Sequence, residues 1–96
     1  MIISEKKCHI EDLLGSKARV KILKVLAINE ELTISLIINK TRSNYSNVIK
    51  HLNYLKDLNL VQEKQFGRIK IFRYKNENVK ARSLKRFIEI WESNCY

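Results

Sequence analysis

The stretch SNYSNVIKHLNYLKDLNLV, from Ser43 to Val61, carries a polar face of an uncommon kind. Apolar residues recur in it at helical intervals, as Val48, Leu52 and Leu55, and this spacing predicts an amphipathic helix. The opposite side of that helix presents amide, hydroxyl and amine groups, on Ser46, Asn47, Lys50, Asn53 and Tyr54. An ordinary solvated face is richer in Glu and Lys, because these residues favour a helix more than Asn and Ser do.

This set of polar groups suits contact with the edges of DNA bases. An Asn amide can pair with adenine N6 and N7, and a Lys ammonium can reach guanine O6 and N7 or a phosphate. Hydroxyls near the helix start, on Tyr45 and Ser46, can donate to phosphates beside unpaired backbone N–H groups. We therefore predict a recognition helix over about residues 44–58 that lies in the major groove of double-stranded DNA. Asn is common throughout the chain, so an Asn-rich solvated face is the simpler alternative.

The charge of the chain favours a polyanionic partner. Its 96 residues include 19 Lys and Arg against 10 Asp and Glu, which leaves a net charge of +9. The segment from Arg42 to Lys75 holds +6 of this charge, because it contains eight basic residues and only two acidic ones, Asp57 and Glu63. These basic residues are Arg42, Lys50, Lys56, Lys64, Arg68, Lys70, Arg73 and Lys75. The alternative is a basic surface that serves only to keep the chain in solution.

The residues after the predicted recognition helix change from a helical to an alternating pattern. The runs LVQEKQ and IKIFRYK flank FGR, and two such runs around a Gly predict a β-hairpin, or wing, over residues 62–74. Arg68 lies beside the turn Gly at the tip, where an Arg side chain can enter a narrow minor groove. We expect Lys64, Lys70 and Arg73 to contact phosphates, although charged residues also serve to blunt the edge of a sheet.

Three helical segments precede the recognition helix and position it. We expect a short helix in IEDLL, a central one in KARVKILKVLAIN capped by Ser16, and a third in ISLIINK capped by Thr33. The segments NEEL and TRSN are predicted to be turns, and Ser43 or Asn44 caps the helix that follows. The predicted fold class is mainly α with a small β-hairpin (α+β), in a single domain over residues 1–96.

The chain resembles the winged helix-turn-helix regulators of the ArsR and MarR type, with archaeal members most similar, at LLGSKARVKILKVL, LTISLIINKTRSNYSNVIKHLNYLKDLNLV and FGRIKIFRYK. The resemblance covers about residues 10–92 and implies a dimeric transcriptional regulator that binds DNA. The family usually has Gly where Arg42 stands, so we expect a positive φ at Arg42. Together the residues and the resemblance give these candidate DNA contacts: Arg42, Asn44, Tyr45, Ser46, Asn47, Lys50, Tyr54, Lys64, Arg68 and Lys70.

The last helical segment, over about residues 79–94, has an apolar face that is broader than a monomer of this size needs. We predict that this face, joined by residues of the first helix, pairs with its copy in a twofold homodimer. The predicted interface residues are Ile10, Leu13, Leu84, Phe87, Ile88 and Trp91. The alternative is that the segment closes the core of the monomer.

Two cysteines, Cys8 and Cys95, lie near opposite ends of the chain. Free thiols, a disulfide within one subunit and a disulfide between subunits are all compatible with the sequence. A metal site from Cys8, His9 and Cys95 is less favoured. Metal sensors of the ArsR type commonly carry Cys in the helix before the turn, and TISLIINK has neither a thiol nor an imidazole. We therefore expect no metal and no cofactor.

Other classes of function find little support in the residues. There is no Gly-rich phosphate loop, nucleophile motif or pair of carboxylates in an apolar setting, so we expect no enzyme. No apolar run has the length of a membrane span, and the first residues lack the apolar stretch of a signal peptide, which predicts a cytoplasmic protein. No small-molecule ligand is evident. A winged helix that binds protein or RNA is the alternative function.

Overall fold

A computed structural model describes residues 9–93 of the chain. Helices and strands follow one another in this part as α1 (Ile10–Leu13), α2 (Lys17–Asn29), β1 (Glu31–Thr33), α3 (Ile34–Thr41), α4 (Tyr45–Asp57), β2 (Val61–Phe66), β3 (Ile69–Tyr74) and α5 (Val79–Ser93). The predicted fold class is confirmed, because the chain is mostly helical with a small antiparallel sheet, in the order of a winged helix-turn-helix. No helix within residues 9–93 is long and apolar enough to cross a membrane.

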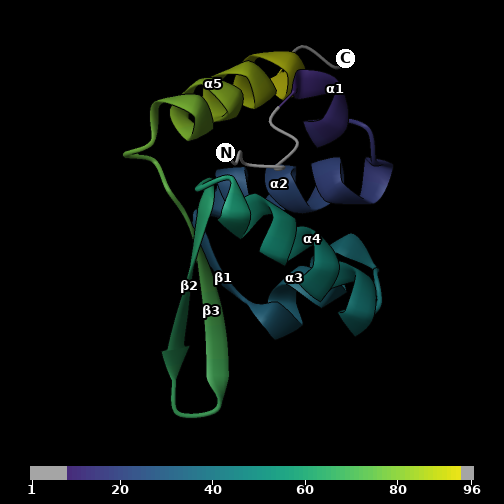
Figure 1. The fold of residues 1–96 in the computed structure, drawn as a ribbon, viewed down its shortest axis with the longest axis vertical. Coiled ribbons are helices and arrows are strands. Elements are labelled where there is room, and N and C mark those ends of the chain that lie inside the picture. Colours follow the sequence, from purple (N-terminus) through teal and green to yellow (C-terminus); the bar gives the residue numbers. More distant parts are fainter. Residues whose placement is uncertain (1–8, 94–96) are drawn as a thin grey trace, which may run out of the picture.

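Helix α2 lies at the centre of the fold, as its broad apolar pattern predicts. It contacts α3, α4, α5 and the sheet, and α5 covers it at one end of the molecule while the β2–β3 hairpin projects from the other (Figure 1). Side chains of α2 and of every neighbouring element form one buried cluster: Leu13, Ile22, Leu23, Leu26, Ala27, Leu32, Ile37, Val48, Leu52, Leu55, Leu60, Val61, Phe72, Tyr74 and Ala81. Each fully buried Leu, Ile, Val or Phe stabilises the fold by about 1.5–3 kcal/mol relative to exposure.

Side-chain caps fix where the three central helices begin. The Ser16 hydroxyl accepts a hydrogen bond from the backbone N–H three residues later (3.2 Å), and Thr33 caps α3 in the same way (3.2 Å). For α4 the cap is Asn44, whose side-chain oxygen accepts from the N–H of Asn47 (2.9 Å). The predicted caps are thus confirmed, with Asn44 rather than Ser43 at α4. Each such cap is worth about 1 kcal/mol.

The sheet has one strand more than the sequence pattern indicated. Its order is β1-β3-β2, all antiparallel, and β1 overlaps the segment NEEL, which was expected to be only a turn. Three residues are too few to show an alternating pattern, so this strand depends on tertiary pairing. Leu32 faces Phe72 across the ladder, and the Tyr74 N–H donates to the Glu30 carbonyl (2.7 Å). The hairpin is therefore joined to the helical core through β1.

The C-terminal helix is fixed to the sheet by one buried tyrosine. The Tyr74 hydroxyl donates a hydrogen bond to the carbonyl of Ala81 (2.6 Å), and both residues are fully buried. Burial raises the pKa of Tyr74 to about 12, so the phenol keeps the proton that it donates. The contact holds the first turns of α5 against β3.

Candidate nucleic-acid interface

The outward face of α4 is polar and exposed along its length. Asn44, Tyr45, Ser46, Asn47 and Lys50 are all exposed. The apolar residues Val48, Leu52 and Leu55 are fully buried. No acidic residue occupies the first turn of the helix, so the partial positive charge at its start favours an anion such as a phosphate.

The turn between α3 and α4 has the geometry expected from its sequence. Arg42 adopts a left-handed conformation, with φ 57° and ψ 36°, and its N–H donates to the Ile38 carbonyl (2.9 Å). The expected positive φ is thus confirmed. The preceding Thr41 is buried and its hydroxyl donates to the Ile37 carbonyl (2.7 Å). This turn exposes the Arg42 side chain immediately before the exposed start of α4.

Tyr54 differs from the other candidate contacts of α4. Its ring is half-buried against the core, and the guanidinium of Arg19 lies over it, 3.7 Å from the ring centroid. Arg19 also donates from Nη1 to the carbonyl of Asp12 (2.6 Å). Tyr54 therefore has a packing role between α2 and α4 that sequence reasoning missed, and a DNA contact by it stays a prediction.

A buried histidine lies on the inner side of the same helix. His51 is 6% exposed, and its Nδ1 has no hydrogen-bond partner among residues 9–93. Burial lowers the pKa of His51, and the positive charges of Arg19 and Lys50 lower it further. The neutral imidazole is thus the form that fits this part of the core.

The lysines of the wing already have carboxylate partners. Lys64 Nζ lies 3.4 Å from Glu31 Oε2 on β1. Lys70 on β3 and Lys56 at the end of α4 both approach Glu63, at 3.9 Å and 2.8 Å from its two oxygens. Exposed pairs of this kind contribute about 0–1 kcal/mol each, so a phosphate can replace the carboxylate at little cost. Lys64 and Lys70 stay candidate phosphate contacts.

Arg73 has a different environment from the one expected for a phosphate contact. Its guanidinium donates to Glu77 Oε2 (2.8 Å) and, through Nε (3.0 Å) and Nη2 (2.8 Å), to Gln62 Oε1. The hydrogen bonding of Arg73 to Glu77 is the main cause that lowers the pKa of the Glu77 carboxyl to about 2. Arg73 therefore ties β2 and β3 to the segment that leads into α5.

The wing tip combines an unpaired cation with two exposed apolar residues. Gly67 and Arg68 form a two-residue turn in which Gly67 has φ 61°, a conformation that favours Gly. Arg68 is exposed and forms no ion pair within residues 9–93. Phe66 and Ile69, on either side of the turn, are 59% and 55% exposed. Sequence reasoning missed these two residues, which lie on one face because the hairpin register pairs them across the turn.

The predicted dimer residues divide between the core and the surface. Leu13 is buried, and Leu84 and Ile88 pack against the core, so most of their surface is already covered within the monomer. Ile10, Phe87 and Trp91 are more than half exposed, and Ile90, which sequence reasoning missed, is 48% exposed. The rings of Phe87 and Trp91 lie 6.0 Å apart. Phe87 and Trp91 thus extend the core-facing stripe of α5 into an exposed edge, and pairing through this edge stays a prediction.

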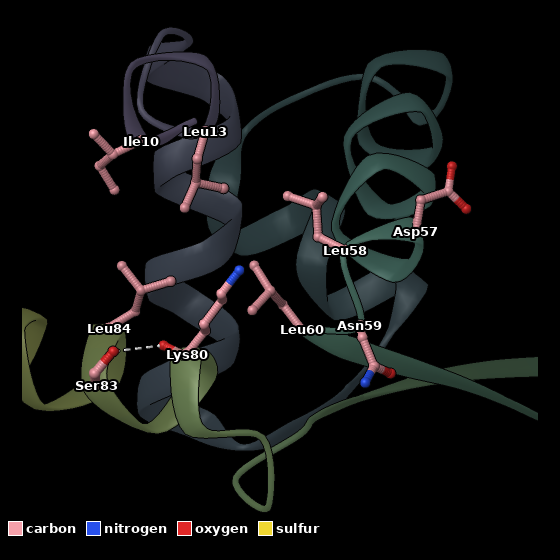
Figure 2. A pocket seen from close by; sticks show the side chains of 9 residues that line it. All are labelled: Ile10, Leu13, Asp57, Leu58, Asn59, Leu60, Lys80, Ser83 and Leu84. Atoms are coloured by element: carbon pink, nitrogen blue, oxygen red, sulfur yellow. Dashed lines mark hydrogen bonds between the residues drawn. The ribbon is translucent and has the colours of Figure 1, made fainter. Parts of the chain in front are cut away.

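Two open grooves border α5. One, of about 380 Å³, lies between α1, the end of α4 and the start of α5, with an apolar lining and a polar rim. Figure 2 shows its lining, which is Ile10, Leu13, Asp57, Leu58, Asn59, Leu60, Lys80, Ser83 and Leu84. The other, of about 500 Å³, lies between α2 and α5 and includes Leu14, Phe87 and Trp91. The predicted dimer residues therefore line both grooves.

The cysteine alternatives fall outside the described residues. Cys8 and Cys95 are both in the parts of the chain that are not described, so their state stays a prediction. Within residues 9–93, no three His, Cys, Asp or Glu side chains are grouped so that they could hold a metal ion.

Comparison with known proteins identifies relatives of this fold. A family model described as "Bacterial regulatory protein, arsR family" matches residues 16–63. No curated protein matches the chain. A possible transcriptional regulatory protein from Mycobacterium bovis (fragment 1–100) is 22% identical, with a TM-score of 0.66 over 84% of both chains. An ArsR family transcriptional regulator is 21% identical, with a TM-score of 0.60 over 86% of this chain and 87% of that one. Sso10a-2, a DNA-binding protein from Sulfolobus solfataricus, is 19% identical, with a TM-score of 0.58 over 81% and 83%.

Proposed function

This chain belongs to the ArsR family of winged-helix, DNA-binding transcriptional regulators, which are not enzymes, and we propose that it binds a specific double-stranded DNA sequence as a homodimer. The observation that carries the proposal is the outward face of α4, which is exposed, polar and free of acidic residues from Asn44 to Lys50. A regulator of this kind acts where the genome is, so we place it in the cytoplasm.

In this proposal α4 enters the major groove and reads bases through its middle turn. Asn47 and Lys50 lie on consecutive turns of the exposed face, where an amide suits adenine and an ammonium suits guanine or a phosphate. The side-chain oxygen of Asn44 caps the helix, and its NH₂ group donates a hydrogen bond to a phosphate. The hydroxyls of Tyr45 and Ser46, at the start of the helix, donate hydrogen bonds to phosphates of the DNA backbone.

The cations around α4 supply binding that does not depend on sequence. Arg42 stands before the helix and Arg68 at the wing tip, and both are exposed. Lys64 and Lys70 exchange their carboxylate partners for phosphates. Each neutralised phosphate releases counterions, so the affinity should fall steeply as the salt concentration rises.

The exposed apolar face of α5 supports the second part of the proposal. Phe87 and Trp91 are 56% and 65% exposed, and their helix α5 lies at the end of the molecule opposite the wing (Figure 1). Covering such side chains is favourable at roughly 25 cal/mol per Å², and a second copy offers an identical face. Ile10, beside α5, joins the interface, while Leu13, Leu84 and Ile88 support it from beneath. A twofold axis there would set two α4 helices about 34–36 Å apart, or a multiple of that, along the DNA.

Selection of bound fragments from a random duplex library tests both parts together. We expect recovery of an inverted repeat whose half-sites are spaced by one or more turns of DNA. Duplex RNA should compete poorly against the selected DNA, because side chains cannot read the narrow major groove of A-form RNA. Recovery of no preferred sequence, or equal competition by RNA, would contradict the proposal.

A further inference from the structure

The tip of the β2–β3 hairpin carries two large apolar side chains that neither the core nor the phosphate contacts explain. Phe66 and Ile69 are 59% and 55% exposed. They face each other in the hairpin register, and paired residues project on the same side of a sheet, so the two side chains form one patch. Single exposed apolar residues are common, but an adjacent pair on a protruding tip marks a contact surface.

The fold keeps this patch away from the apolar face of α5. Figure 1 shows the hairpin tip at one end of the longest axis, with α1 and α5 at the other end. A dimer formed through α5 therefore does not cover Phe66 or Ile69. The buried cluster does not reach the tip either. The buried residue nearest the tip is Val61 on β2 and Phe72 on β3.

The charged groups at the tip select the class of partner. Arg68 lies in the turn between the two apolar residues and forms no ion pair within the described part of the chain. Lys64 and Lys70 flank the tip on opposite faces of the hairpin, because they sit at alternate register positions. A partner that meets cations and apolar side chains at one point is charged outside and apolar inside. The minor groove of duplex DNA offers both, because phosphates line its rims and apolar side chains can insert between the stacked base pairs below.

We propose that Phe66, with Ile69 beside it, inserts as a wedge between two base pairs of the minor groove that flanks the site read by α4. The inference rests on the proposed function and deepens it, because the wing then deforms the DNA as well as neutralising its phosphates. Apolar wedges of this kind kink a duplex by roughly 20–90°. Pyrimidine–purine steps such as TA unstack most readily, so the wedge adds a sequence preference at bases that α4 does not contact.

Contacts at the base and at the tip of the hairpin hold it in place, as a wedge that deforms DNA requires. Phe72 and Tyr74 at its base are fully buried, and Arg73 binds both Gln62 on the partner strand and Glu77 beyond the sheet. At the tip, Gln65 Nε2 donates to the Gly67 carbonyl (3.2 Å). These contacts fix the direction in which the apolar patch points.

The test uses the full chain and a duplex that it selects from a random library. The fluorescent base 2-aminopurine, which brightens when unstacked, replaces one base at a time in the flanking minor groove. Dyes at the two ends of the same duplex report bending. We expect brightening at one step on each flank and a shortened end-to-end distance, both lost in Phe66→Ala and weakened in Ile69→Ala. Phe66→Ala should also lower the affinity about tenfold on a TA-flanked site.

Matched variants separate the wedge from other effects. Ile28, on α2, is 55% exposed like Ile69, so Ile28→Ala should leave both DNA signals unchanged. Binding of the wild type with neither signal at any step would overturn the wedge and leave the proposed function standing. Failure of the wild type to bind any duplex would overturn the proposed function and the wedge together. If Phe66→Ala releases the chain from phosphatidylserine vesicles but keeps the DNA distortion, the tip is a membrane contact and the wedge is overturned.

Discussion

Helices α4 and α5 are similar in their inner faces and opposite in their exposed side chains. They have 13 and 15 residues, and each packs an apolar stripe against the core around α2. The outer face of α4 presents Asn47 and Lys50, whereas the exposed apolar side chains of α5, Phe87 and Trp91, lie at the edge of its apolar stripe beside α2. Folding requires only the inner stripes. The exposed side chains are free to differ, and under the proposed function they meet two kinds of partner, a polyanion for α4 and the apolar surface of a second copy for α5.

The comparison also makes the outer faces good places for substitution. An exposed side chain contributes little to the free energy of unfolding, so a change there rarely exceeds about 0.5 kcal/mol in stability. A loss of DNA binding or of association in such a variant therefore reports on the interface itself. Circular dichroism of each variant checks that the fold is kept.

The largest expected effect is at the apolar face. Trp91→Glu should place an uncompensated charge in the α5 interface and weaken dimerisation by about 3 kcal/mol or more. The variant should sediment as a monomer and bind a single half-site weakly. Glu89→Gln, at an exposed polar position of the same helix, is the matched control and should leave the dimer intact. A wild type that sediments only as an 11.4 kDa species, yet binds the full inverted repeat, would break the comparison at α5.

The second-largest expected effect is on DNA binding by the polar face of α4. Asn47→Ala should weaken binding to the selected site by roughly 1–3 kcal/mol and binding to random duplex much less. The Asn47 N–H, which Asn44 caps, is kept in this variant, so the helix start is not disturbed. Asn29→Ala, at the end of α2, tests for a general effect of removing an amide. Equal losses on specific and random DNA would show that Asn47 contacts the backbone and not a base.

The sequence predicts the elements that local patterns determine. Helix spacing located α2, α4 and α5, and side-chain oxygens at Ser16 and Thr33 located two helix starts. The left-handed turn at Arg42 was expected from the resemblance, because the ArsR and MarR type usually has Gly at this position. These features depend on neighbours within a few residues along the chain, which a single sequence contains.

The features that were missed depend on residues far apart in the chain. Strand β1 exists because β3 has a free edge beside it, and Tyr54 is half-buried because Arg19 from α2 lies over its ring. The division of α5 between core and surface follows from where Tyr74 anchors it. A helical pattern identifies an apolar stripe, but it does not specify which of its edges, Ile88 or Trp91, meets the core.

A smaller effect distinguishes the wing from α4. Arg68→Ala should lower the affinity for specific and random duplex alike, and should reduce the slope of log affinity against log salt by about one unit. Lys64→Ala should change the affinity less, because Lys64 gives up its pair with Glu31 when it binds a phosphate. Arg86→Ala, on the exposed part of α5, is the control for lost charge. A slope and an affinity that are unchanged in Arg68→Ala would remove the wing tip from the DNA interface.

The remaining difference lies between the two inner faces, and it concerns pH. That of α5 consists of Ala81, Leu84 and Ile88, none of which titrates. That of α4 includes His51, whose pKa is lowered below its ordinary value of 6.5 by burial and by the nearby charges of Arg19 and Lys50. The unfolded chain therefore binds a proton more readily than the folded one. Below pH 6.5 this group should lower the free energy of unfolding until the pH reaches its folded-state pKa, and above 6.5 it should have no effect.

Urea unfolding of the wild type and of His51→Gln, at pH values from about 5 to 8, measures this contribution, because His is the side chain that ordinarily titrates in that range. The free energy of unfolding of the wild type should decline toward the acid end, and the variant should lose most of that decline, whatever its own stability at pH 8. Since His51 lies on the helix that carries the polar face, acid should weaken the packing of α4 against the core and leave the packing of α5 unchanged. Identical pH profiles for the wild type and His51→Gln would show that both helices are held independently of pH, and the difference between their inner faces would have no energetic consequence.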